Sequence, residues 1–204
     1  MFRSQYYNDL KQLAREVRQE YGLNSARVLR SDLRRIYSDQ GIHIDLWPHK
    51  LRRLRGAYFN DELGPTVMLC KGLPEDPMVF TMAHELKHHI ADSGVSLSYC
   101  DPSNQSAPIE IGAEVFAAEL IYPEALFSSD LTAMGIGPGS CTPEVIVRLK
   151  RETRTTLSYA GLVKRAEFLD FAAEGSLGNV KWKKLEESIY GVPFYKKIRA
   201  RRAF

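Results

Sequence analysis

The chain has 204 residues, of which 44% are hydrophobic, and a formal net charge of +3 at pH 7. A chain of this length can bury a sizeable core as one domain, or as one domain with a small appendage. No apolar run is long enough to span a bilayer, and the opening stretch MFRSQYYNDLKQLAREVRQE lacks the apolar region of a signal peptide. The three cysteines fit neither a disulfide framework nor a cysteine zinc site. These features argue against membrane binding and predict a cytoplasmic protein.

The first part of the chain predicts two helices followed by a small sheet. Apolar residues at helical spacing predict one helix over residues 5–21 and a second from a cap at Ser25 to residue 39. Alternation of apolar and polar residues over 42–46 predicts a half-buried strand. The segments GAYFND and TVMLCKG, joined by the turn-rich DELGP, predict a hairpin.

The next stretch, MVFTMAHELKHHIAD, carries the strongest chemical signal. His84 and His88 are four residues apart, so on a helix they lie one turn apart on the same face. Imidazoles at that spacing suit a tetrahedral zinc ion, and Glu85 can take a proton from a metal-bound water. The pattern predicts zinc-assisted hydrolysis.

The surrounding residues favour a helix for this motif. Asp76 is expected as the N-cap, Pro77 as the first helical residue and Gly94 as the end. A buried stripe at helical spacing is expected from Val79, Met82, Ala83, Leu86 and Ile90.

A catalytic zinc usually has three protein ligands, and the stretch SAPIEIGAEVFAAELIYP offers the third. It predicts a helix capped by Ser106 and stopped by Pro123, with apolar positions at Ile111, Val115, Ala118 and Ile121 or Tyr122. Glu110 and Glu114 are four residues apart and share a face. We expect one of them to bind zinc and the other to orient a ligand histidine, and we favour Glu110 as the ligand.

An oxyanion formed during hydrolysis needs a further hydrogen-bond donor. Tyr58, Tyr99 and Tyr122 are the candidates, and the sequence does not choose among them.

The two stretches together resemble the ImmA/IrrE family of intracellular metallopeptidases. FTMAHELKHH followed by IEIGAEVFAAELIYP is similar to the family signature, a HExxH helix and then a helix of the pattern E-x-x-A-N-x-F-A-A-x-L-L-x-P. The resemblance runs from about Leu23 to Phe127. It implies that His84, His88 and Glu110 bind zinc and that Glu85 is the catalytic glutamate, while Glu114 stands where the family has Asn.

The resemblance also implies a fold and a substrate. The expected fold is α+β, a zincin-like lobe over residues 1–130 with a small sheet packed on the HExxH helix, followed by a helical region over 131–204. Members of the family cleave helix-turn-helix transcriptional repressors in stress responses or in mobile-element and phage immunity. Because the first helices run directly into the sheet, we expect the repressor to be a separate protein. Mn²⁺ or Fe²⁺ could occupy the same ligands as Zn²⁺.

The rest of the chain is expected to be helical and ends in a basic tail. Gly and Pro residues over 128–140 mark a boundary. Helices are predicted over about 142–152, capped by Thr142 or Cys141, and over about 158–172, either as a packed pair or as a DNA-reading helix-turn-helix. The tail mixes aromatic residues with eight cations that could contact nucleic acid or an acidic partner. These cations are Lys181, Lys183, Lys184, Lys196, Lys197, Arg199, Arg201 and Arg202.

Two other functions fit the same residues. The protein could bind zinc without proteolysis and act as a regulatory or interaction partner of the repressor. Retention of Glu85 argues against this, because a structural zinc site needs no general base. Alternatively, the basic tail could make the protein a DNA-associated metalloprotease, whose DNA binding would fall steeply with salt.

Overall fold

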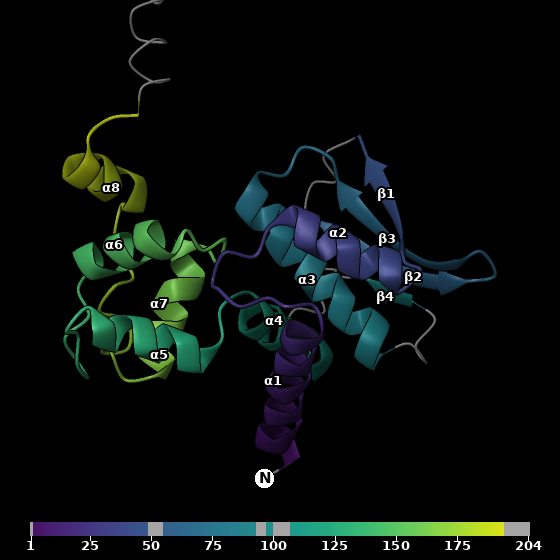
Figure 1. The fold of residues 1–204 in the computed structure, drawn as a ribbon, viewed down its shortest axis with the longest axis horizontal. Coiled ribbons are helices and arrows are strands. Elements are labelled where there is room, and N and C mark those ends of the chain that lie inside the picture. Colours follow the sequence, from purple (N-terminus) through teal and green to yellow (C-terminus); the bar gives the residue numbers. More distant parts are fainter. Residues whose placement is uncertain (1, 49–54, 93–96, 100–106, 194–204) are drawn as a thin grey trace, which may run out of the picture. The chain divides into compact units, whose positions relative to one another are not determined.

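The computed structural model describes residues 2–48, 55–92, 97–99 and 107–193. Within these ranges the chain forms eight helices and one four-stranded sheet, which confirms the predicted α+β class (Figure 1). No helix in these ranges combines the length and the apolar content needed to cross a membrane.

The chain divides into two compact units. The first comprises Met1–Leu126 with the short segment Thr155–Ser158, and the second comprises Phe127–Arg154 and Tyr159–Phe204. The returning segment is tied to the first unit by a hydrogen bond of 2.8 Å that the Thr156 hydroxyl donates to the Val28 carbonyl.

The first unit contains four complete helices and the sheet. Its elements in chain order are α1 (Phe2–Glu20), α2 (Arg30–Asp39), β1 (His43–Trp47), β2 (Gly56–Asp61), β3 (Gly64–Cys70), α3 (Glu75–Ala91), β4 (Leu97–Tyr99) and α4 (Pro108–Ile121).

The sheet has the strand order β1-β3-β2-β4. Strand β2 is antiparallel to both β3 and β4, while β1 is parallel to β3. The predicted hairpin is confirmed as β2 and β3, and Gly64 in its turn has a φ of +96°, a conformation that glycine adopts without strain. The predicted half-buried strand is confirmed as β1, in which exposed and partly buried residues alternate.

Helix α3 carries the HExxH motif and packs against β2, β3, α2 and α4. The predicted apolar stripe is confirmed except at Ile90, which is partly exposed. The predicted start is wrong. Asp76 lies within the first turn rather than at the N-cap, because the amide of Met78 already bonds the carbonyl of Pro74. The helix ends at Ala91, and the predicted end at Gly94 falls outside the described residues.

Helix α4 packs against α1 and α3, and its buried face matches the predicted apolar positions only at its end, where Ile121 and Tyr122 are fully buried. Ile111, Val115 and Ala118 are only partly buried. Contact with helices on two sides places small residues inward, because Gly112 lies so close to α1 that a Cβ there would approach Leu10 Cδ1 to 2.7 Å. The fully buried apolar residues are Ala113, Phe116, Ala117, Leu120 and Ile121. The predicted cap, Ser106, falls outside the described residues.

Helix α2 begins at Arg30, so the predicted start at Ser25 is wrong. Asp32 accepts a hydrogen bond of 2.8 Å from the amide of Leu29, as a capping-box residue does. The residues before it make other contacts, since Ser25 Oγ accepts from the Arg27 amide and the Val28 side chain is fully buried. Tertiary contacts therefore shorten the helix at its N-terminus.

The second unit is helical, as predicted. It holds most of α5 (Glu124–Ala133) and all of α6 (Pro143–Thr153), α7 (Tyr159–Phe168) and α8 (Trp182–Tyr190). The predicted cap of α6 is confirmed, because the Thr142 hydroxyl accepts from the Val145 amide. Helix α7 ends before the predicted residue 172, since Asp170 adopts a left-handed φ of 60°.

Two of these helices were not predicted from the sequence. Helix α5 lies in part of the stretch interpreted as a boundary, and it buries Phe127 and Leu131 one turn apart. Helix α8 lies in the stretch interpreted as a basic tail. Its Trp182 stacks on Tyr159 with ring centroids 5.0 Å apart, and Tyr190 lies 4.2 Å from the guanidinium of Arg151. Contacts with other helices therefore stabilise α8, which buries none of its own residues completely.

Candidate metal centre

The structure brings His84, His88 and Glu110 together. One donor atom from each lies within 4.8 Å of the other two, although α3 supplies the histidines and α4 the carboxylate. His84 Nε2 is 3.2 Å from Glu110 Oε2, and His88 Nε2 is 3.6 Å from Glu110 Oε1. Glu110 lies in the first turn of α4, where the helix dipole favours a negative charge.

These separations fit a tetrahedral zinc ion. Zinc bonds to nitrogen and oxygen of about 2.0–2.2 Å place neighbouring ligand atoms about 3.3–3.6 Å apart in a tetrahedron. The two histidine–carboxylate distances, 3.2 Å to Oε2 and 3.6 Å to Oε1 of Glu110, lie close to that range and end on different oxygens of the carboxylate. Two imidazoles and one carboxylate also form the donor set of a catalytic zinc site with an open fourth position.

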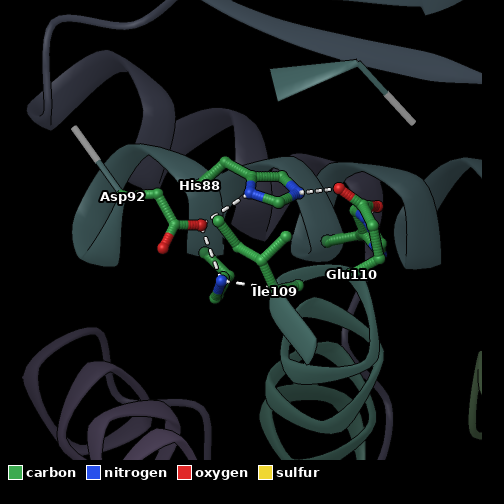
Figure 2. A network of polar contacts seen from close by, with 6 residues as sticks. His88, Asp92, Ile109 and Glu110 are labelled. Carbon is green, nitrogen blue, oxygen red and sulfur yellow. Dashed lines mark hydrogen bonds and ion pairs between the residues drawn. The ribbon is translucent and has the colours of Figure 1, made fainter. Parts of the chain in front are cut away.

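Asp92 fixes the orientation and tautomer of His88. Its Oδ2 lies 2.7 Å from His88 Nδ1, so His88 is held between Asp92 and Glu110 (Figure 2). Burial alone would raise the pKa of Asp92, but hydrogen bonds from His88 and Lys87 lower it below its ordinary value. The ionised carboxylate can only accept, so it favours the tautomer in which Nδ1 carries the proton and Nε2 has the lone pair.

The Nε2 atom of His88 is therefore set up as a ligand. It is buried and has no hydrogen-bond partner among the described residues. Buried polar atoms normally have a partner. The lone pair of His88 Nε2 faces Glu110 and has no hydrogen-bond donor in the described part of the chain. This observation fits a metal ion between His88 and Glu110.

The environment of His84 is strongly anionic. Burial by itself lowers the pKa of His84, but the hydrogen bond with Glu110 and the charges of Glu85, Glu110 and Glu114 outweigh it and raise the pKa. This concentration of negative charge favours a cation, whether a proton or a metal ion. Metal binding would require His84 to lose its proton at Nε2.

Glu85 is buried beside this group, with 1% of its surface exposed. Its Oε1 lies against β2, where Gly56 leaves room for it. A Cβ at Gly56 would lie 3.0 Å from that oxygen and 2.5 Å from Thr81 Cγ2. The absence of a side chain at Gly56 therefore allows the sheet to pack closely on the carboxylate.

We expect Gly56→Ala to disturb Glu85 more than the zinc ligands. The added methyl group must displace Thr81 or the carboxylate, and such overpacking typically costs about 1–3 kcal/mol. Thermal unfolding should show this loss, while zinc affinity measured by chelator competition should change little. A large loss of zinc affinity would contradict the placement of Gly56 against Glu85 and away from the metal-binding residues.

The remaining candidates from the sequence lie in different places. Glu114 is exposed and is not among the three converging ligands. The Tyr58 hydroxyl lies 3.1 Å from His89 Nδ1. Tyr122 is buried at the far end of α4, about 18 Å from Glu110 by the rise of about 1.5 Å per residue, so the structure does not bring it to the group. Tyr99 lies in β4, opposite Ala57.

Three of the basic candidates lie at the start of α8. Lys181, Lys183 and Lys184 are exposed. The other five, Lys196, Lys197, Arg199, Arg201 and Arg202, fall outside the described residues.

Sequence reasoning missed Asp92 and Lys87. The signal for Asp92 was present, because it lies one helical turn after His88 and a carboxylate at that spacing can reach Nδ1. Lys87 gave no such signal, since a lysine between two ligand histidines is expected to be solvated.

The fold and the site together define a zincin-like domain. Its features are a HExxH helix packed on a small sheet, and a third ligand from the following helix. Residues 38–135 match the Peptidase M78 family model, described as the IrrE N-terminal-like domain. No curated protein matches the chain significantly. The family match supports the predicted resemblance, and the chain carries a zinc metallopeptidase-like domain.

Proposed function

We propose that the protein is a zinc-dependent endopeptidase of the cytoplasm that cleaves a helix-turn-helix transcriptional repressor and thereby relieves repression. The observation that carries the proposal is the convergence of His84, His88 and Glu110 beside a buried Glu85, in a stretch that matches the IrrE N-terminal-like domain. The repressor as substrate rests on the resemblance to ImmA/IrrE peptidases.

His84, His88 and Glu110 would hold the metal. When bound, zinc would polarise a peptide carbonyl and would lower the pKa of a coordinated water toward about 7. Asp92 keeps His88 in the tautomer that such a site needs.

Glu85 would act as the general base and then as the general acid. It accepts the proton of the water that attacks the peptide carbonyl, and it returns that proton to the leaving amine. Burial of this carboxylate against Gly56 restricts its movement and shields it from bulk water. Tyr58 and Tyr99 remain the candidates for stabilising the oxyanion, and Tyr99 is the one whose strand lies at the edge of the sheet.

A protein that binds zinc without proteolysis would also need three ligands, but it would not need Glu85. A buried glutamate beside the ligands therefore supports catalysis over a structural role.

The test is cleavage of a candidate repressor encoded beside this protein. The repressor is incubated with zinc-loaded protein, with protein treated with a chelator, and with the chelated protein after zinc is restored. Intact mass spectrometry should show two discrete fragments in the first and third reactions and none in the second. An uncut repressor that binds the zinc-loaded protein would favour the interaction function instead.

A further inference from the structure

Lys87 is a fully buried cation within the metal-binding motif. Its ammonium donates a hydrogen bond of 2.6 Å to Asp92 Oδ2 and one of 3.1 Å to the carbonyl of Ile109. It also lies 5.9 Å from the centre of the Tyr6 ring. Lysine is rarely buried completely unless it is paired, so these contacts need an explanation.

The first contact leads to one metal ligand. Asp92 Oδ2 accepts from both Lys87 Nζ and His88 Nδ1 (Figure 2). The ammonium stabilises the buried carboxylate as an anion, and the anion holds the imidazole of His88 in place. Removing the ammonium would leave the partly buried carboxylate of Asp92 with His88 but without its cationic partner.

The second contact leads to the other helix. The Ile109 carbonyl belongs to the peptide bond that joins Ile109 to Glu110, and a peptide bond is planar and rigid. Fixing the direction of this carbonyl therefore fixes the peptide plane from which Glu110 departs. Figure 2 shows Ile109 and Glu110 at the start of α4, with His88 on α3 and Asp92 directly after the end of that helix.

We propose that Lys87 is a positioning residue for the metal site. Its ammonium bonds Asp92, which holds His88, and the carbonyl of Ile109, which precedes Glu110, and it thereby sets the placement of His88 relative to Glu110. The inference rests on the proposed zinc site. One ammonium links the end of α3, close to His88, to the start of α4, close to Glu110. His88 and Glu110 therefore keep their separation before a metal ion binds. Such preorganisation raises metal affinity, because less ordering remains to be done on binding.

The test compares zinc affinity, by chelator competition, for the wild type, Lys87→Met, Asp92→Asn and the double variant. Met keeps an unbranched stem without the charge. Each single change should weaken zinc binding about 10–100-fold, as changes to residues that hydrogen-bond to metal ligands do. Because the two residues act as one unit, the double variant should lose about as much as either single variant.

Arg18→Met is the matched control. Arg18 is also buried, and it donates hydrogen bonds of 2.6 and 3.3 Å to the carbonyls of Leu120 and Ile121 at the other end of α4. Its loss should lower the melting temperature of the metal-free protein and leave zinc affinity unchanged. The visible spectrum of the cobalt-substituted protein, which reports ligand geometry, should change in Lys87→Met and not in Arg18→Met.

The outcomes separate this inference from the proposed function. If the wild type binds no zinc, the metal site itself is wrong, and the inference fails with it. If the wild type binds zinc and Lys87→Met binds it equally well, only the positioning role is wrong. Should Lys87→Met fail to fold, Asp92→Asn carries the test, because unchanged zinc affinity in that variant would also overturn the inference.

Discussion

Glu85→Gln should retain its zinc and cleave the repressor about 10²–10⁴-fold more slowly, the range that a general base contributes. Glutamine has nearly the same volume as glutamate, so it fits the space beside Gly56. It cannot accept the proton of the attacking water. Since Glu85 is outside the converging group of His84, His88 and Glu110, zinc content should stay near that of the wild type.

The measurement is the rate of fragment formation under single-turnover conditions, with zinc content determined on the same samples. Glu114→Gln is the matched control, because it removes an exposed carboxylate on the neighbouring helix, and it should retain most of the activity. Cleavage at an undiminished rate by Glu85→Gln would mean that another group acts as the base.

Glu110→Gln should lose zinc on dialysis. Its zinc affinity should fall by more than about 100-fold, which exceeds the usual effect of mutating a residue that only hydrogen-bonds to a metal ligand. Glu110 is the carboxylate that the structure places near both histidines, at 3.2 and 3.6 Å. The amide keeps the shape of the side chain but loses its negative charge. With only two ligands left, the site is no longer that of a catalytic zinc.

Glu114→Gln should weaken zinc binding by no more than about fivefold, because an exposed charge contributes about 1 kcal/mol or less. Its charge does raise the pKa of His84, so a small effect is expected. Zinc retained per chain after dialysis distinguishes the two variants. If Glu114→Gln lost its zinc and Glu110→Gln kept it, the two glutamates would have exchanged roles.

The elements predicted best were those with a local cause. The helix containing His84 and His88, the hairpin and the cap of α6 were all predicted from spacing, turn residues and a capping threonine. Elements whose ends depend on contacts with distant residues were predicted less well. The cap of helix α2 lies four residues later than predicted, and α8 is held by stacking on Tyr159 and a cation–π contact with Arg151.

The sequence by itself determined the chemistry that the chain can perform. The spacing of His84 and His88 follows from the period of a helix, and Glu85 is next to His84 whatever the rest of the fold does. The sequence narrowed the third ligand to Glu110 or Glu114. These two residues share a helix face and differ in their distance along the chain from the helix that carries His84 and His88.

Only the tertiary structure decided which carboxylate approaches the histidines and what holds the group together. The packing of α4 on α3 brings Glu110 to the site and leaves Glu114 exposed. The same packing buries Lys87, so that its ammonium bonds Asp92 beside one ligand and the Ile109 carbonyl beside another. Contacts between residues far apart in the chain depend on how helices pack, and periodicity along one helix carries no information about its neighbour.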